Sequence, residues 1–218
     1  MFDDRVSAGR HLATALGGSV HPDSLVLGVP RGGVVVAAEV ARVHSLELDV
    51  VVVRKIGAPG NPEYAVGAVD EDGRIIGGHD PLVERDYLER AAEAGRTEIV
   101  RRLAAYRGSR PAPRIADREV IIIDDGIATG LTLEAALESL RRRGAHRITV
   151  ATPVAAPEAA NRITGIADEL VVLELPHGFS AVGQFYRDFG QTSDAEVVAL
   201  LEEAWSRREA SPPEGGPA

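Results

Sequence analysis

Short apolar runs alternate with stretches of helical periodicity along almost the whole of this 218-residue chain. Each run is too short for a helix and is apolar at successive positions, which is typical of strands buried on both faces of a parallel sheet. We expect such strands at residues 24–29, 49–53, 119–123, 147–152 and 169–173. The alternation predicts an α/β fold: a mainly parallel, twisted sheet flanked by helices, with right-handed crossovers.

Helices are predicted between these strands from apolar residues at helical spacing. They cover residues 4–16, a stretch that ends near 43, residues 81–106, the segment after 132 and a short stretch from 157. Ser193 and Glu196 form a capping box, S-x-x-E, that opens a last helix. The basic run Arg141–Arg143 falls at the end of a helix, where cations interact favourably with the helix dipole.

Residues 54–77 interrupt the alternation. The run Gly57-Ala58-Pro59-Gly60-Asn61-Pro62 is dense in Pro and Gly, so we expect an irregular loop there and no regular structure. Residues 65–69 and 74–77 flank Asp70-Glu71-Asp72-Gly73, a pattern that predicts an antiparallel hairpin.

The length of the chain fits one domain. We expect that domain over residues 1–206, with a small hood at about 176–192, and a flexible tail at 207–218. The chain has no cysteine, which excludes disulfides and thiolate–metal sites. No apolar run approaches the roughly 20 residues that span a bilayer, and the first residues resemble no secretory signal. We therefore expect a cytoplasmic protein with no membrane partner.

The net charge of −9 argues against a protein that coats nucleic acid, because such proteins need basic surfaces. It does not argue against a phosphorylated small molecule, which backbone N–H groups and one or two cations can bind. Parallel α/β sheets bind ligands in the crevice beyond the C-terminal ends of their strands. Three loops of unusual composition leave the predicted strands at that edge: residues 30–33, 54–63 and 124–132.

The most specific of these loops reads Asp124-Asp125-Gly126-Ile127-Ala128-Thr129-Gly130-Leu131-Thr132. A strand that runs into a turn rich in Gly and Thr and then into a helix makes a phosphate cradle, because backbone N–H groups and the helix dipole both favour an anion. Two carboxylates facing that anion would repel it. They fit a site in which they face vicinal sugar hydroxyls or a metal ion.

Three other kinds of site do not fit this loop. A Walker loop needs Gly-Lys followed by Ser or Thr, and a dinucleotide fingerprint needs G-x-G-x-x-G at the start of the helix. Neither pattern is present. A response-regulator pocket needs a third acid and a lysine on later strands, whereas the one lysine of the chain, Lys55, lies far upstream.

Four apolar residues, Asp-Asp, and then x-x-x-Thr-Gly-x-Thr resemble the phosphoribosyl pyrophosphate (PRPP) fingerprint of type I phosphoribosyltransferases. The resemblance implies that Asp124 and Asp125 hold the ribose 2- and 3-hydroxyls. It implies that the 5-phosphate is held by Gly126, Ile127, Ala128, Thr129, Gly130, Leu131 and Thr132. Over nearly the whole chain, the blocks GVPRGG, VRKIGAPGNPEYAVGAV, VIIIDDGIATG and GQFYRDFGQ are similar to bacterial predicted phosphoribosyltransferases of unassigned acceptor.

The same resemblance assigns roles to the two other loops. The pyrophosphate would be contacted through backbone amides and the Arg31 side chain, in a loop made of Pro30, Arg31, Gly32 and Gly33. A plain turn with a solvated Arg31 is the alternative. Arg54 and Lys55 begin a segment that resembles the flexible loop that closes over PRPP, and they would neutralise the leaving pyrophosphate. A solvated basic pair is the alternative there.

Three of the four phenylalanines and one tyrosine gather within residues 179–189. In this family a hood over the sheet binds the acceptor, usually by stacking on an aromatic ring. We expect Phe179 or Tyr186 near the acceptor and Phe185 and Phe189 in packing roles. An aromatic cluster that only pins the C-terminal segment is the alternative. Ala128 stands where 6-oxopurine enzymes have an aspartate, which disfavours hypoxanthine and guanine without establishing adenine.

The resemblance thus predicts an enzyme that transfers phosphoribosyl from PRPP to a nitrogen acceptor, a nucleobase, in nucleotide salvage. It implies Mg²⁺ bound mainly through PRPP and water, and we expect a homo-oligomer such as a dimer. Catalysis would depend on stabilising the leaving group and on positioning. A non-catalytic sensor of PRPP or a nucleotide, and a purely structural α/β module, are the alternatives.

Overall fold

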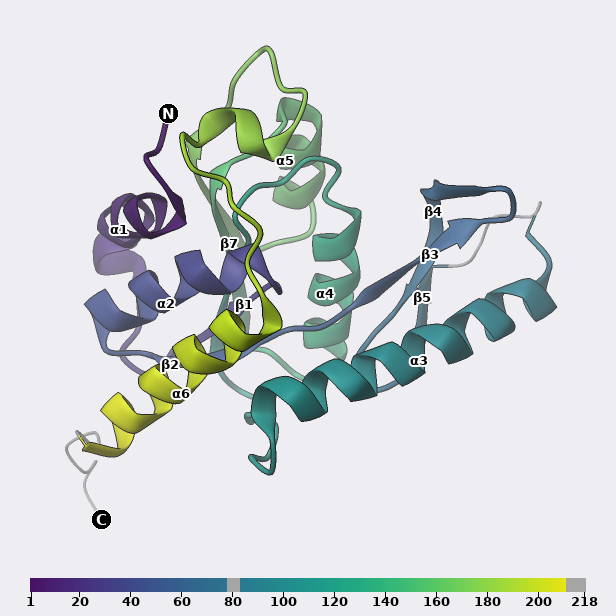
Figure 1. Ribbon diagram of the computed structural model, residues 1–218, viewed down its shortest axis with the longest axis horizontal. Coiled ribbons are helices and arrows are strands. Elements are labelled where there is room, and N and C mark those ends of the chain that lie inside the picture. The colour runs from purple at the N-terminus through teal and green to yellow at the C-terminus, as the bar shows by residue number, and fades with distance from the viewer. Residues whose placement is uncertain (78–82, 211–218) are drawn as a thin grey trace.

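The computed structural model describes residues 1–77 and 83–210 and centres on a five-stranded parallel sheet (Figure 1). The strand order is β2-β1-β6-β7-β8, and every neighbouring pair is parallel. The strands are β1 (Leu25–Gly28), β2 (Glu47–Val50), β6 (Glu119–Ile123), β7 (Arg147–Val154) and β8 (Glu169–Glu174). The α/β fold expected from the sequence is confirmed.

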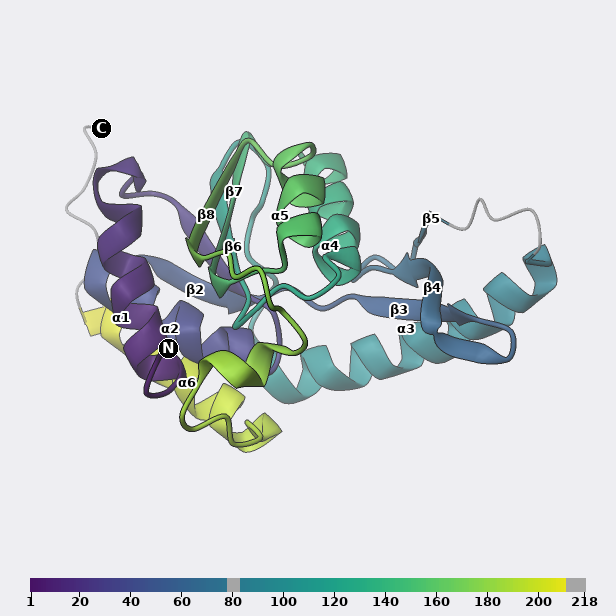
Figure 2. The same cartoon turned by 90° about the horizontal axis from the view of Figure 1, so that it is seen from above.

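Helices cover both faces of this sheet (Figure 2). One face carries α1 (Arg5–Leu16), α2 (Gly32–His44) and α6 (Asp194–Ala210), and the other carries α4 (Leu131–Arg142) and α5 (Pro157–Thr164). Alternate residues of β6 feed the two cores: Ile121 and Ile123 pack on the α1, α2 and α6 side, and Val120 and Ile122 on the other. This two-sided burial is the reason that the strands are unbroken apolar runs.

A second, antiparallel sheet stands beside the main one, in the order β3-β4-β5 (Figure 1). It consists of β3 (Arg54–Ala58), β4 (Asn61–Val69) and β5 (Ile75–Gly77), and it packs on the long helix α3 (Arg85–Arg107). The expected hairpin between β4 and β5 is confirmed. Its turn closes with a hydrogen bond of 3.1 Å from Asp70 N to Arg74 O.

The prediction of an irregular loop at residues 57–62 is wrong. β3 and β4 form a hairpin whose turn is confined to Pro59 and Gly60. A Pro-Gly pair suits the two central positions of a tight turn, and Gly60 has the positive φ, 76°, that such a turn requires. The pairing shifts register on both sides of Gly57. The irregular backbone that we expected over the whole segment is therefore confined to bulges within the strand.

The second strand of the main sheet also lies earlier than expected, at Glu47–Val50 instead of 49–53. Val52 is buried, but its N–H donates to a carboxylate oxygen of Glu71 at 2.9 Å and not to a neighbouring strand. Burial alone therefore extended the prediction past the point where the chain leaves the sheet.

The helices α3 and α6 differ most from their predicted boundaries at one end each. The helix expected at 81–106 begins at Arg85, and its first expected residues, 81 and 82, lie outside the described part of the chain. The capping box is confirmed: Ser193 N donates to Glu196 Oε2 at 2.7 Å. α6 then runs to Ala210, past the expected domain boundary at 206, and residues 211–218 are not described. None of the described helices is long and apolar enough to cross a membrane.

A buried ionic network joins the small sheet to the main body. Arg107, at the end of α3, donates to Asp49 Oδ1 at 2.8 Å and to Glu71 Oε2 at 3.3 Å. Arg142 and Arg143, at the end of α4, form ion pairs with Asp70 and Glu71 respectively. The basic run therefore does more than meet a helix dipole, because it holds the β4–β5 turn against α4.

Candidate active site

Two of the three unusual loops meet at the carboxyl edge of the main sheet. β1 and β6 are neighbours, so the loops that follow them are adjacent, and Val29 N donates to Ile123 O at 2.8 Å. Gly32 and Gly33 permit the close approach. A Cβ on Gly33 would stand 2.7 Å from Ile123 O, and one on Gly32 would collide with the carboxylate of Asp125. Any side chain in either place would push the loops apart.

The paired carboxylates lie in this contact. Asp124 and Asp125 are partly buried, and Asp124 Oδ1 accepts a hydrogen bond of 2.9 Å from Asp125 N. Burial, and then the neighbouring charge of Asp125, raise the pKa of Asp124 well above its usual value. A protonated or shared-proton pair can donate as well as accept, and the ionised pair offers strong acceptors to hydroxyl groups.

The rest of the loop forms an open helix N-terminus. Ile127 is pinned by two backbone hydrogen bonds, from its N to Val154 O at 2.9 Å and from Ala156 N to its O at 2.8 Å. Ala128 and Thr129 are exposed beyond it. Gly130 is the N-cap of α4, with a φ of 79°, and no side chain caps the helix. The N–H groups of the first turn therefore have no side-chain acceptor at the cap, and an uncapped helix N-terminus can bind phosphate.

A second helix N-terminus adjoins the Asp124–Asp125 pair. α2 begins at Gly32, and its N-cap, Arg31, makes no side-chain capping hydrogen bond. The peptide between Pro30 and Arg31 is cis. The Arg31 guanidinium is about one-third exposed, and its nearest carboxylate, Asp194 of α6, lies at 3.9 Å. Arg31 is thus held loosely at the rim of the site, as an anion-binding arginine would be.

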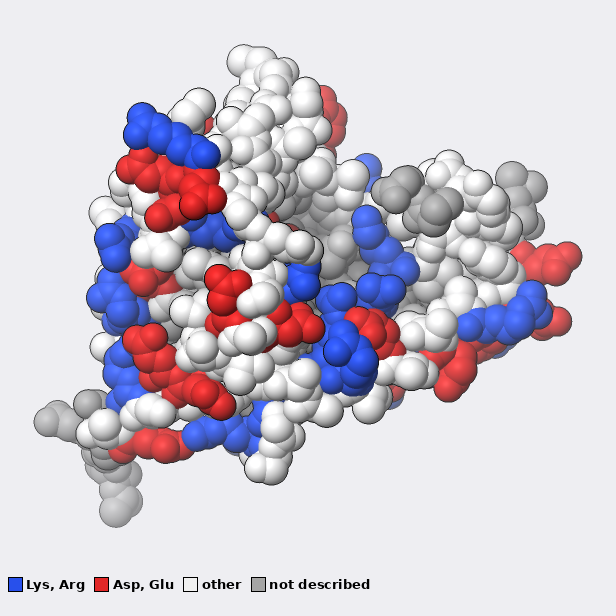
Figure 3. All heavy atoms as spheres, in the orientation of Figure 1, with Lys and Arg blue, Asp and Glu red and all other residues white. Residues whose placement is uncertain are grey.

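Arg54 and Lys55 point to opposite faces of β3, as neighbouring strand residues do. Arg54 lies against α3, with its Cβ 3.7 Å from where a Cβ on Gly95 would stand. Lys55 lines a hollow on the other face, together with Leu131 and Glu134 of α4. Of these two residues, Lys55 is the one that lies beside the first turn of α4. Basic side chains gather where the small sheet and α3 meet the main body (Figure 3).

The hood includes the N-terminus, which the sequence did not indicate. Phe2 N donates to Phe185 O at 2.8 Å, and Arg187 N donates to Phe2 O at 2.9 Å. We call residues 185–192 the hood strap. Phe179 stacks on Phe185 with ring centroids 5.5 Å apart and is only partly buried. Its contact with an acceptor stays a prediction.

Tyr186 is located differently from the expectation of a ring that meets the acceptor. Its side chain is 5% exposed among Phe2, Val154 and neighbours, so its ring faces are covered. Its hydroxyl donates to Asp125 O at 2.6 Å, which makes it a support for the Asp-Asp loop. Phe189, expected to pack, does so against Tyr186 and Gly183, and at 37% it is the most exposed of the hood aromatics. Spacing in the sequence could not distinguish the two.

Arg5 is the site residue that sequence reasoning missed. Its Nε donates to Asp125 Oδ2 at 2.6 Å, its NH1 donates to Gly190 O at 2.7 Å, and its guanidinium lies 3.9 Å above the Phe189 ring. A weak signal existed, because an arginine in the first turn of a helix opposes the helix dipole and needs another partner. Arg5, Arg31, Asp125 and Phe189 border a hollow of about 380 Å³ under the hood strap.

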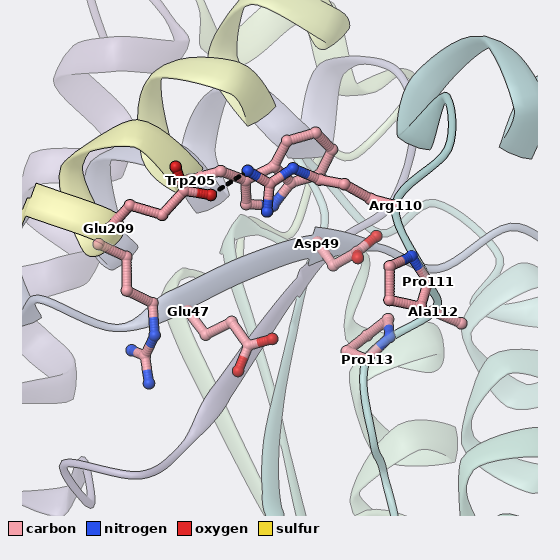
Figure 4. A pocket seen from close by; sticks show the side chains of 9 residues that line it. Glu47, Asp49, Arg110, Pro111, Ala112, Pro113, Trp205 and Glu209 are labelled. Carbon is pink, nitrogen blue, oxygen red and sulfur yellow. Dashed lines mark hydrogen bonds and ion pairs between the residues drawn. The ribbon is translucent and has the colours of Figure 1, made fainter. Parts of the chain in front are cut away.

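Another hollow, of about 430 Å³, lies far from these loops at the beginning of β2 (Figure 4). Glu47 and Asp49 point into it from the strand, and Trp205 forms one wall, with its Nε1 bonded to Leu48 O at 3.0 Å. It opens at the amino edge of the sheet, opposite the Asp-Asp loop, and so is separate from the candidate site.

Comparison with known proteins bears on this geometry. The family model described as "Phosphoribosyl transferase domain" matches residues 6–188. Two Mycobacterium tuberculosis proteins named "Putative phosphoribosyl transferase" are 45% identical over 210 residues, which is 94% of this chain and 47% of theirs. The chain therefore spans about half the length of these relatives. A crystal structure from Thermus thermophilus is 46% identical with a TM-score of 0.83, covering 93% of this chain and 98% of that one.

Proposed function

The chain belongs to the phosphoribosyl transferase domain family, and from that premise we propose that it transfers the phosphoribosyl group of PRPP to a nitrogen acceptor and releases pyrophosphate. One observation carries the proposal: two open helix N-termini, at Gly130 and Arg31, flank the Asp124–Asp125 pair at a single edge of the sheet. Two phosphate-binding positions with a pair of hydroxyl acceptors between them match the chemistry of PRPP.

Each part of the substrate has a counterpart in this arrangement. The 5-phosphate occupies the open turn that begins α4, where Thr129 and Thr132 add hydroxyl donors. The ribose 2- and 3-hydroxyls donate to Asp124 and Asp125. The pyrophosphate lies at the start of α2, where backbone N–H groups and the Arg31 guanidinium neutralise its charge.

The reaction breaks the bond between C1 and the pyrophosphate oxygen and forms a bond from C1 to the acceptor nitrogen. Positive charge develops on the ribose as the leaving group departs, and the adjacent carboxylates stabilise it. Arg31 stabilises the negative charge of the leaving pyrophosphate, and Lys55, beside the first turn of α4, adds positive charge near the 5-phosphate. The described site offers no dedicated general base, so rate enhancement comes mainly from positioning and charge stabilisation.

Magnesium fits this site as a companion of the substrate. Mg²⁺ prefers oxygen ligands and keeps several waters, whereas the loops at Gly32 and Gly130 present N–H groups, which bind phosphate oxygens and not metals. We therefore assign Mg²⁺ mainly to oxygens of PRPP and water. When bound there it would supply charge neutralisation to the departing pyrophosphate.

We place the acceptor in the part of the hollow under the hood strap that Phe189 and Gly190 border, and leave the part bordered by Arg31 and Gly32 to the pyrophosphate. The hollow has a volume of about 380 Å³, which is within the range of small-molecule pockets, and Phe189 is among the residues that border it. The acceptor class that suits such a pocket is a nucleobase. The reaction would then belong to nucleotide salvage in the cytoplasm. The exposed methyl of Ala128 offers no carboxylate for a 6-oxopurine. Self-association as a homo-oligomer remains an expectation, to be measured by gel filtration.

The test measures binding and turnover separately. Calorimetry with PRPP in millimolar Mg²⁺ tests the pocket, and a panel of nucleobases with PRPP, followed by pyrophosphate release, tests transfer. Asp124→Asn and Asp125→Asn are expected to lower turnover on the order of 10²-fold or more, because the sugar loses charged acceptors. Asp117→Asn is the matched control, since Asp117 is 86% exposed and its φ of 64° suits asparagine.

Three outcomes separate the hypotheses. Transfer to one base with loss in both aspartate variants supports the enzyme. Binding of PRPP without pyrophosphate release against any base supports a sensor and overturns the enzymatic proposal. No binding of PRPP supports a structural module.

A further inference from the structure

The orientation of Asp125 depends on a residue from the other end of the chain. The Asp124 carboxylate is held by a backbone N–H of its own loop. Among the described residues the Asp125 carboxylate has no such bond, and Arg5 donates to it at 2.6 Å. Both side chains of this pair are largely buried, at 12% and 15% exposure. A short ion pair shielded from water is stronger than an exposed one and restricts the carboxylate to one orientation.

Arg5 is itself held on three sides, so it can act as a rigid support. Its Nε is bound to Asp125, its NH1 to Gly190 O, and its guanidinium plane covers the Phe189 ring. A planar guanidinium with several donors can make these contacts together, whereas a lysine cannot. The contacts join α1, the Asp-Asp loop and the hood strap at one point, next to the hollow proposed for the acceptor.

The single bond also leaves room for substrate. Arg5 engages only Oδ2 of Asp125, and in the described part of the chain Oδ1 accepts no hydrogen bond. That oxygen remains available for a ribose hydroxyl. The positive charge of Arg5 opposes the mutual repulsion of two adjacent carboxylates, which otherwise disfavours the doubly ionised pair.

We propose that Arg5 is a positioning residue of this site: it fixes the Asp125 carboxylate for the ribose and couples it to the hood strap beside the acceptor pocket. This inference rests on the proposed function, because it assigns a purpose to Arg5 only if Asp125 binds PRPP. It adds a residue outside the loops that carry the family resemblance.

A pH profile distinguishes positioning from simple structural support. The charged and titratable groups around the aspartates and Arg5 are Arg31 at the start of α2, the Tyr186 hydroxyl of the hood strap and Glu196 of α6, which interacts electrostatically with Arg5. Arg5 lowers the pKa of Asp124, against the effects of burial and Asp125 that raise it. Removal of Arg5 raises the pKa of Asp124 further, so the carboxylate pair takes up a proton at a higher pH. The acid limb of PRPP binding, the pH range in which affinity falls on acidification, therefore moves to higher pH.

The experiment compares wild type, Arg5→Ala, Arg5→Lys and Arg10→Ala by calorimetric titration with PRPP and Mg²⁺ over about pH 5 to pH 9. Arg10 is the control, because it lies on the same helix, is 62% exposed and pairs with Glu39, away from the site. Arg5→Ala is expected to weaken PRPP binding on the order of 10- to 100-fold, as loss of a buried charge-assisted bond does. It is also expected to shift the acid limb upward. Compared with Arg5→Ala, Arg5→Lys is expected to return the acid limb close to its wild-type position, because the positive charge is kept. It is expected to restore the affinity for PRPP less fully, because lysine cannot make the three contacts together.

The outcomes are distinguishable from those of the proposed function. If wild type does not bind PRPP, the proposed function fails, and this inference with it. If wild type binds but Arg5→Ala and Arg5→Lys bind with the same affinity and the same acid limb, only the role of Arg5 is refuted. Circular dichroism and thermal unfolding monitor folding, and Arg5→Lys keeps the test decisive should Arg5→Ala fail to fold.

Discussion

Substitution of Arg107 by methionine is expected to destabilise the protein strongly. The Arg107 side chain is 7% exposed, and it binds Asp49 at 2.8 Å, Val50 O at 3.0 Å and Glu71 at 3.3 Å. Methionine would fill the space but leave the buried Asp49 carboxylate without its cation and the buried Glu71 with Arg143 alone. Removal of one partner from a buried ion pair costs about 3–5 kcal/mol. Arg101→Ala on the same helix, at a 55% exposed pair with Glu98, is expected to cost at most about 1 kcal/mol.

The cost of Arg107→Met is also expected to depend on pH. Burial raises the pKa of Asp49 in the folded protein, and Arg107 opposes that rise. Without Arg107 the pKa of Asp49 rises further above its unfolded value of about 3.9. The folded state then binds more protons than the unfolded state in the intervening pH range, so stability falls as the pH increases through it. The destabilisation should therefore be smaller at about pH 5 than at about pH 8.

Urea unfolding of the three proteins at both pH values measures these differences in the free energy of unfolding. A cost for Arg107→Met no greater than that for Arg101→Ala would refute the assignment of a buried, interdependent network. A cost that grows on acidification would refute the electrostatic explanation even if the total loss were as large as expected.

Two further substitutions test how the candidate site is assembled. Gly33→Ala places a methyl 2.7 Å from Ile123 O and 2.9 Å from Asp124 Cα; we expect a loss of about 1–3 kcal/mol in urea unfolding and weaker PRPP binding, and unchanged values for both would show that the loops need no close contact. Tyr186→Phe removes the hydroxyl that donates to Asp125 O at 2.6 Å; we expect a loss of about 1 kcal/mol in the same assay, and a variant as stable as wild type would indicate that water replaces the bond.

Periodicity in the sequence was sufficient to predict the main sheet and its helices. An apolar run such as Val120–Ile123 is expected to be buried, because the side chains on both of its faces are apolar and pack against helices. Apolar character failed as a criterion for strands where a buried residue is not paired with a neighbouring strand. Val52 is as buried as a strand residue, yet its N–H goes to Glu71, and Gly57 lies in a strand because a bulge absorbs its irregularity. Propensity describes single residues, whereas pairing depends on a partner elsewhere in the chain.

For the candidate site, the sequence by itself determined the local chemistry, because that chemistry lies in two short stretches. One holds the Asp124–Asp125 pair and the turn around Gly130, and the other holds Arg31 and the two glycines after it. Only the tertiary structure decided which residues from afar join them. Arg5 reaches Asp125 across 120 positions, Tyr186 is turned inward, and Arg54 and Lys55 are separated onto opposite faces of a strand. The physical reason is that short-range geometry follows from neighbouring residues, whereas contacts between distant segments are set by how helices and strands pack.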